Sequence, residues 1–369
     1  MKIFFEKVNA VLAIVFKILL AVILIFFGCS CTKNEELNDL KENKLSGQST
    51  LLLSLKGSNP DNGVISKVPE IDGGYEDTNV DTLDIFVFKN SDNYPTDTYK
   101  HLTSDDIPNL VDIPIRTTVG EKIICVIANS HISKSQLQNI KDYNTFKTLF
   151  TDLKNENVNN WSMYGEKECK LETNTEVSIG LTRFVAKISL SQLNINFENT
   201  PYQNSDYKVK AYLTNVIGQK IIWNGDNTNN LLIYNKEKND NSTTHFHNES
   251  IIKENLNFIN NKLKETHYFF CYENPIEKEN NDLEYTRLVI ELSLDGHTYY
   301  YPININQANY GYQNEYTHHG IQRNNEYKIE LTIEHPGSND PDLPITTNDY
   351  NFSISVNPWL NHPVSTIKF

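Results

Sequence analysis

The sequence predicts a mainly β protein of two β-sandwich domains, with short helices in the connections. Apolar and polar residues alternate in many short segments, such as "TLDIFVF" and "YKVKAYL", and this is the period of a half-buried strand. Turn-forming Gly, Pro, Asn and Asp separate these segments, and hardly any of the chain has helical spacing. A chain of 369 residues is long enough for two domains that each bury a core.

The charge balance excludes two classes of partner. The net charge is −14, and charged residues make up 22% of the chain. Such an acidic chain is unsuited to binding nucleic acid, or to an electrostatic grip on anionic lipid. The only arginines are Arg116, Arg183, Arg287 and Arg323, so planar phosphate clamps are scarce.

The N-terminus has the features of a secretory signal. Lysines precede the apolar run "VLAIVFKILLAVILIFFG", which ends at "GCSC". This resembles a bacterial lipoprotein signal, so residues 1–31 are interpreted as signal peptide and lipobox. Cys29, which follows Gly28, is the favoured lipidation site, and Cys31 is the second candidate. The alternative is a transmembrane anchor starting near Val11, which the charge of Lys17 disfavours.

Residues 32–182 are predicted to form the first domain, after a polar tether. Its expected strands are Thr50–Lys56, Val80–Phe88, Leu110–Ile115, Glu121–Asn129 and "TEVSIGL". In the first of them Leu51, Leu53 and Leu55 share one side, which we expect to face the core. Between Ser133 and Lys154 the spacing becomes helical, with one apolar side made by Leu137, Ile140, Phe146, Leu149, Phe150 and Leu153.

Residues 183–369 are predicted to form the second domain. Its expected strands are "RFVAKISLSQLNI", "YKVKAYLTNV", "HYFFCYEN", "YTRLVIELSL", "TYYYPININ" and "NEYKIELTIEH". Residues 224–262 form a polar insert in which we expect surface loops and one helical turn. Near the end, Phe352, Ile354 and Val356 alternate with polar residues, and Trp359 follows a break at Pro358. This terminal strand pairs either within its own domain or with another molecule.

No motif for catalysis or for a cofactor is present. The chain lacks GxGxxG, P-loop, HExxH and GxSxG sequences, so we expect no enzyme activity and no cofactor. The pairs His245/His247 and His318/His319 have spacings that can bind zinc, but solvated histidines in loops explain them better. The acidic clusters "EIDGGYED" and "GSNDPD" lack the ligand spacing of a calcium loop and are better explained as turns. The odd, scattered thiols Cys125, Cys169 and Cys271 imply no disulfide framework.

Several stretches, taken in order, resemble the fimbrillins of Bacteroides-group bacteria, the subunits of type V pili. The closest resemblance is to the major, FimA-type subunit. The strongest match is "YYYPININ", then "QRNNEYKIELTIEHPGSNDPDLPI", then "FSISVNPW", where Arg323, Asn324, Tyr327, Ile329 and Trp359 fall on the family pattern. "LLLSLKGSN", "LDIFVF", "GEKIICVIAN" and "RFVAKISL" match earlier in the chain. The resemblance implies transthyretin-like sandwiches.

The resemblance also implies assembly by donor-strand exchange. A lipoprotein precursor reaches the outer membrane, and a trypsin-like protease cuts the loop after the first strand. Loss of that strand opens a groove, which a C-terminal strand of the next subunit fills. In this chain Leu51, Leu53 and Leu55 would fill the groove first, and Phe352, Ile354, Val356 and Trp359 would replace them. "VSTIKF" (Val364–Phe369) is the second candidate for the donor segment.

The chain departs from the family pattern in one respect. Stalk subunits are typically cut after an Arg, but no Arg precedes Arg116 here, and Lys67 is the basic residue well inside the loop. Either a Lys-tolerant protease cuts at Lys67, or the uncut chain remains a lipid-anchored anchor subunit. The C-terminal match favours the stalk.

The implied partners are further copies of the subunit, accessory tip or anchor subunits, the outer membrane through the lipid of the precursor, and a host or bacterial surface ligand. The implied location is a cell-surface fimbrium that supports adhesion and biofilm formation. Two other interpretations compete with it. One is a glycan-binding surface lipoprotein, and the other is an extracellular hydrolase.

Overall fold

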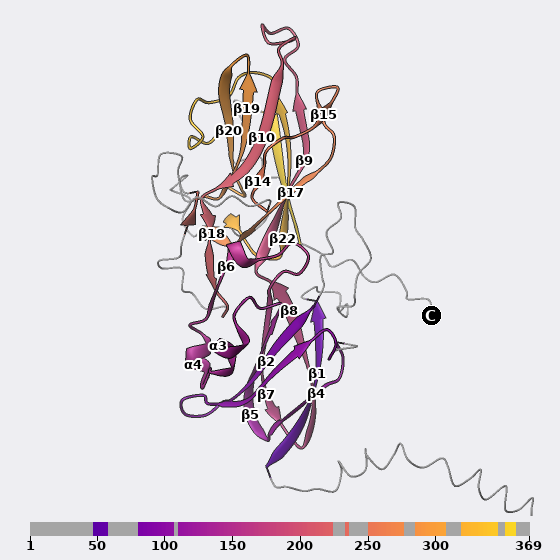
Figure 1. The fold of residues 1–369 in the computed structure, drawn as a ribbon, viewed down its shortest axis with the longest axis vertical. Helices are drawn as coiled ribbons and strands as arrows, with labels where there is room; N and C mark the ends of the chain where they lie inside the picture. The colour runs from indigo at the N-terminus through magenta and orange to yellow at the C-terminus, as the bar shows by residue number, and fades with distance from the viewer. Residues whose placement is uncertain are drawn as a thin grey trace, which may run out of the picture. The chain divides into compact units, whose positions relative to one another are not determined.

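The computed structural model describes residues 47–57, 80–106, 110–223, 233–235, 250–276, 285–307, 319–345 and 351–358. The chain divides into two compact units, Met1–Gln48 and Ser49–Phe369, and nearly all of these residues belong to the second. Strands in several sheets make up most of it, with little helix (Figure 1). The predicted mainly β fold class is therefore confirmed.

The first half of the second unit contains a seven-stranded sheet. Its order is β3 (Thr96–Thr103), β2 (Thr82–Lys89), β5 (Gly120–Ala128), β7 (Met163–Leu171), β8 (Asn174–Arg183), β1 (Gln48–Gly57) and β4 (Ile113–Thr118). Neighbouring strands from β3 to β8 are antiparallel, whereas β1 is parallel to β8. The first strand that the structure describes, β1, thus lies inside the sheet, between β8 and β4 (Figure 1).

Alternate side chains of this sheet enter two different cores. Leu83, Ile85 and Val87 of β2 join the core that holds the β1 leucines. Phe86 and Phe88 of the same strand point to the other face, where each contacts Phe146. Their ring centroids lie 5.1 and 5.5 Å from that of Phe146. Two short helices cover that face, α3 (Lys134–Gln138) and α4 (Tyr143–Phe146), followed by β6 (Phe150–Asp152) and a 3₁₀ turn at Leu153–Asn155.

The second half contains two larger sheets. One has the order β15 (Phe258–Ile259), β16 (Lys262–Leu263), β9 (Val185–Ile195), β22 (Asn325–Ile333) and β23 (Asn351–Pro358), and β17 (His267–Tyr272) also pairs with β9. The other has the order β14 (Ile252–Lys253), β10 (Tyr207–Thr214), β19 (Arg287–Leu294) and β20 (His297–Asn304). Short pairs join β11 (Val216–Ile217) to β13 (Ile233–Tyr234) and β18 (Asn274–Ile276) to β21 (His319–Ile321).

Contacts join the two halves across the predicted boundary at residue 183. Strand β6 pairs with β12 (Gln219–Ile221) of the second half. The rings of Trp161 and Phe270 lie 4.6 Å apart. At the boundary itself, buried Arg183, the last residue of β8, donates to Asn324 Oδ1 at 3.0 Å. One apolar cluster also runs through both halves. The division into domains 32–182 and 183–369 stays a prediction.

Several local predictions were wrong. Strands β3 and β7 were not expected, and β4 is Ile113–Thr118 instead of the predicted Leu110–Ile115. The stretch Ser133–Lys154 is not one helix but two short helices, a strand and a turn, so Phe150 is 55% exposed instead of lying on a buried side. The described part of the polar insert forms short strands, and the expected helical turn stays a prediction because residues 224–232 and 236–249 lie outside the described ranges. His319 begins a strand, β21, although its sequence was interpreted as a loop.

Candidate functional site: the first strand and its groove

Strand β1 presents three leucines to the core of the seven-stranded sheet. Leu51, Leu53 and Leu55 are each 0% exposed, and Leu52, Ser54 and Lys56 between them are partly exposed. The parallel register with β8 sets Leu51 opposite Thr175 and Leu55 opposite Ile179. The alternation read from the sequence therefore gives the side of β1 that faces inward.

The space that β1 occupies is a groove with apolar walls. On its other side, the Leu55 amide donates to Leu110 O at 2.8 Å, and the Asp112 amide donates to Ser54 Oγ at 3.2 Å. Most of the buried side chains of this core come from β2, β4, β5 and β8, and they include Leu83, Ile85, Val87, Ile113, Ile115, Ile124, Val126, Val177, Ile179 and Leu181. Leu102 of β3 and Met163 and Leu171 of β7 complete it. Without β1, these side chains and two strand edges would lose their partners.

The terminal strand β23 pairs within its own chain. It is antiparallel to β22, with Ile354 opposite Ile329, and both side chains are 0% exposed. This is the arrangement of the internal-pairing alternative, so a donor role requires β23 to leave β22. The side chains of Phe352 and Val356, and the whole of Trp359 and Val364–Phe369, lie outside the described residues. The donor assignment therefore stays a prediction.

The predicted lipidation and cleavage sites also lie outside the described ranges. This applies to Cys29, Cys31 and Lys67, whose roles remain predictions. Among the residues that the structure does describe, no helix is long and apolar enough to cross a membrane.

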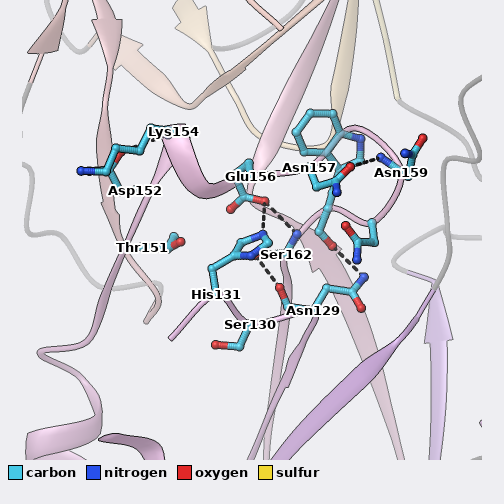
Figure 2. Close-up of polar contacts among 12 residues, drawn as sticks. Asn129, Ser130, His131, Thr151, Asp152, Lys154, Glu156, Asn157, Asn159 and Ser162 are labelled. Atoms are coloured by element: carbon cyan, nitrogen blue, oxygen red, sulfur yellow. Dashed lines mark hydrogen bonds and ion pairs between the residues drawn. The ribbon is translucent and has the colours of Figure 1, made fainter. Parts of the chain in front are cut away.

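A buried carboxylate at the junction of the two halves was not found from the sequence. The Glu156 side chain is 1% exposed, and one of its oxygens accepts from the Tyr272 hydroxyl at 2.8 Å. The other accepts from the Ser162 amide at 3.0 Å (Figure 2). His131 Nε2 lies 3.7 Å from Glu156, and Ser162 Oγ donates to Asn129 O at 2.9 Å. Burial and the negative charge of Glu156 raise the pKa of Tyr272 well above its ordinary value. Its donors hold this carboxylate in a structural role, joining the β5–β7 region to β17.

The remaining candidate groups show no reactive chemistry. Cys125 and Cys271 are fully buried free thiols, and burial raises the pKa of each. In "GSNDPD", Asp340 accepts from the Asp342 amide, which is the expected turn chemistry, and Asp342 forms an ion pair with Arg287 at 3.3 Å. Across the described ranges, no three His, Cys, Asp or Glu side chains converge to hold a metal ion. His245, His247 and His318 lie outside those ranges.

Fold and site together define a class: a β protein in which the first strand fills a groove of its own sheet. Residues 64–183 match the family described as "Major fimbrial subunit protein (FimA)". A curated relative, "Major fimbrium subunit FimA type-2" of Porphyromonas gingivalis, is 45% identical over 67 residues, which is 17% of this chain and 17% of the relative. The aligned segment thus spans about a sixth of that relative.

The fold extends the similarity over most of the chain. A solved fimbrilin (fimA) of Porphyromonas gingivalis W83 shares the fold with a TM-score of 0.62 at 20% identity, covering 86% of this chain and 99% of the other. A solved structure from Bacteroides eggerthii gives 0.60 at 15% identity, covering 86% and 98%. Residues 64–183 are thus similar to the FimA family, and most of the chain has the fold of a solved fimbrilin. The matched family and the solved fimbrilin are described as fimbrial proteins and not as enzymes, which agrees with the expectation of no enzyme activity.

Proposed function

We propose that this protein is a structural subunit of a cell-surface fimbria, exported as a lipoprotein precursor and polymerised by donor-strand exchange once β1 is removed. The observation that carries the proposal is the position of β1. The first described strand lies inside a sheet, with three leucines at 0% exposure. Another extended segment can replace such a strand, because it offers the same backbone hydrogen bonds and the same alternate side chains.

The energetics favour refilling of an emptied groove. Burying a leucine side chain is worth about 1.5–3 kcal/mol, so the three leucines of β1 contribute roughly 5–9 kcal/mol. An empty groove exposes that apolar surface on β2, β4, β5 and β8 to water. A donor strand with matching side chains recovers this free energy. The recovered free energy slows dissociation of the donor strand from the groove.

Strand β23 has two properties that suit a donor. Its sequence has apolar residues at 352, 354 and 356, the same spacing as Leu51, Leu53 and Leu55 in β1. It is also at the end of the sheet order, next to β22, whereas β1 has a neighbour on each side. A strand with one neighbour gives up fewer hydrogen bonds on leaving than a strand with two. Its release from β22 therefore costs less than the loss of β1 from its groove.

Cleavage at Lys67 is the expected trigger. Purified precursor treated with trypsin should give ladders that resist SDS on unboiled gels, because the cut releases β1 for exchange. Mass spectrometry should then find Val68 as the first residue of the polymer. Polymer that still contains an intact stretch from Ser49 to Lys67 would instead favour the lipid-anchored, uncut anchor subunit. Monomer after complete loss of β1 would favour the glycan-binding alternative.

Lipidation at the start of the chain is the expected route to the surface. Replacing both Cys29 and Cys31 by serine should abolish fatty-acid labelling and stop surface delivery, because serine offers no thiol for thioether formation. The single variants assign the site, since only one of them should lose the label. Normal surface display of the double variant would contradict the lipoprotein precursor.

We further propose that the assembled fimbria contains accessory tip or anchor subunits and contacts a host or bacterial surface ligand. These partners are supported by the similarity to fimbrial subunits.

A further inference from the structure

The seven-stranded sheet has a seam where its two end strands face each other. β3 and β4 stand at opposite ends of the sheet order, yet side chains of β3 donate to backbone carbonyls of β4. Thr98 Oγ1 donates to Arg116 O at 2.9 Å, and Lys100 Nζ donates to Pro114 O at 3.0 Å. These side chains thus satisfy backbone carbonyls at the edge of β4, with which a further strand would otherwise pair.

A bulge directs one carboxylate into this seam. The register between β2 and β3 shifts between Val87 and Phe88, which are opposite Thr98 and Thr96, so Asp97 has no residue opposite it. Bulges of this kind re-aim a side chain. The Asp97 side chain is 6% exposed, and its Oδ2 accepts from Thr117 Oγ1 at 2.7 Å, Thr118 N at 3.0 Å and Thr118 Oγ1 at 2.7 Å.

A buried lysine completes the seam cluster, which we define as Asp97, Thr117, Thr118 and Lys122. Lys122 of β5 is 2% exposed, and its Nζ lies 2.7 Å from Asp97 Oδ2 and 2.7 Å from Thr118 Oγ1. Burial alone would raise the pKa of Asp97, but the hydrogen bonds from Lys122, Thr117 and Thr118 hold it well below its usual range. The carboxylate is therefore charged at neutral pH and joins three strands at one point.

This cluster is adjacent to the groove, because β4 forms one wall of the groove that β1 fills. β4 has two neighbours: β1 in the sheet order, and β3 through the seam. Ile113 and Ile115 of β4 are buried against the groove core. When β1 leaves, the seam contacts are what remains to hold β4 at the edge of that apolar surface.

We propose that the seam cluster keeps β4 in place while the groove is empty, so that the groove stays open to an incoming strand. This inference rests on the proposed exchange of β1. Without the cluster, β4 is free to fold over the exposed apolar side chains. If only a tenth of the emptied molecules keep an open groove, the apparent affinity for a strand falls about tenfold.

The test compares strand uptake by cut, full-length chains. Each protein is nicked with trypsin, the trypsin is inhibited, and a fluorescein-labelled peptide with the sequence of residues 48–57 is added. Asp97→Asn removes the charge with little change of shape, and Asp106→Asn is the matched control, since Asp106 bonds only within the exposed turn at Thr103. We expect Asp97→Asn to lower peptide uptake by about tenfold or more, with faster amide exchange in β4, while the control takes up peptide as the unmodified protein does.

A second variant distinguishes loss of the seam cluster from misfolding caused by an unpaired buried charge. Asp97→Asn leaves Lys122 buried without its counter-ion, so the double variant Asp97→Asn/Lys122→Met removes both charges. It should fold when uncut, by circular dichroism, and still lose peptide uptake after the cut. Normal uptake by either folded variant would overturn the role of the seam cluster alone. No uptake by the unmodified nicked protein would overturn the exchange of β1, and this inference with it.

Discussion

Replacing Leu53 by alanine should lower the free energy of unfolding of the uncut chain by about 2–5 kcal/mol, the usual cost of truncating a fully buried leucine. Leu53 is 0% exposed at the centre of β1, in one apolar core with side chains of the neighbouring strands. The same change at Leu52, which is partly exposed on the opposite side of the strand, is the matched control. It should cost less than about 1 kcal/mol, as is usual for surface substitutions. Urea denaturation of both uncut variants measures the difference.

The Leu53 variant also connects stability to assembly. A weaker hold on β1 should speed its departure after trypsin cleavage, so SDS-resistant ladders should form sooner than with unmodified protein. Equal losses of stability at Leu52 and Leu53 would contradict the seating of β1 in an apolar groove. An unchanged rate of ladder formation would show instead that departure of β1 does not limit assembly.

Strand β1 could be predicted from the sequence because a single local pattern, the alternation of its leucines, is enough to predict both the strand and its buried side. Leu51, Leu53 and Leu55 alternate with other residues, and alternation gives the side of a strand that faces a core. The neighbours of β1 could not be predicted in the same way. Its parallel pairing with β8 joins Thr50 to Asn174, and no local pattern encodes a partner so far along the chain.

Strand β3 was missed because its side chains do not alternate between core and solvent. "TDTYKHLT" is polar at most positions, and its residues bond to β4 across the seam, a role that exists only once the sheet curls round. Phe150 was misplaced for a related reason. Its spacing from Phe146 fits one helix, but the helix ends and Phe150 pairs with β12 from the second half. Glu156 gave no signal, since its partners come from three separate segments.

Ile354→Asp tests the central claim most directly, because it places a charge on the strand that we propose as donor. Entering an apolar groove without a partner costs such a charge at least several kcal/mol. In the free subunit, Ile354 is buried opposite Ile329, so we expect β23 to loosen from β22 and the melting temperature to fall. Because β23 ends its sheet order, the rest of the subunit should stay folded. Ser355→Asp adds the same charge at the neighbouring position, on the opposite side of the strand.

The measurement is a mixed assembly. The Ile354→Asp subunit keeps its own groove, so it can accept a strand from another subunit but cannot donate one. Trypsin-treated alone, it should give monomer. Mixed with unmodified subunits in rising proportion, it should cap growing chains and shorten the SDS-resistant ladders, whereas Ser355→Asp should leave their length unchanged. Ladders of normal length from Ile354→Asp alone would contradict donor-strand exchange through β23.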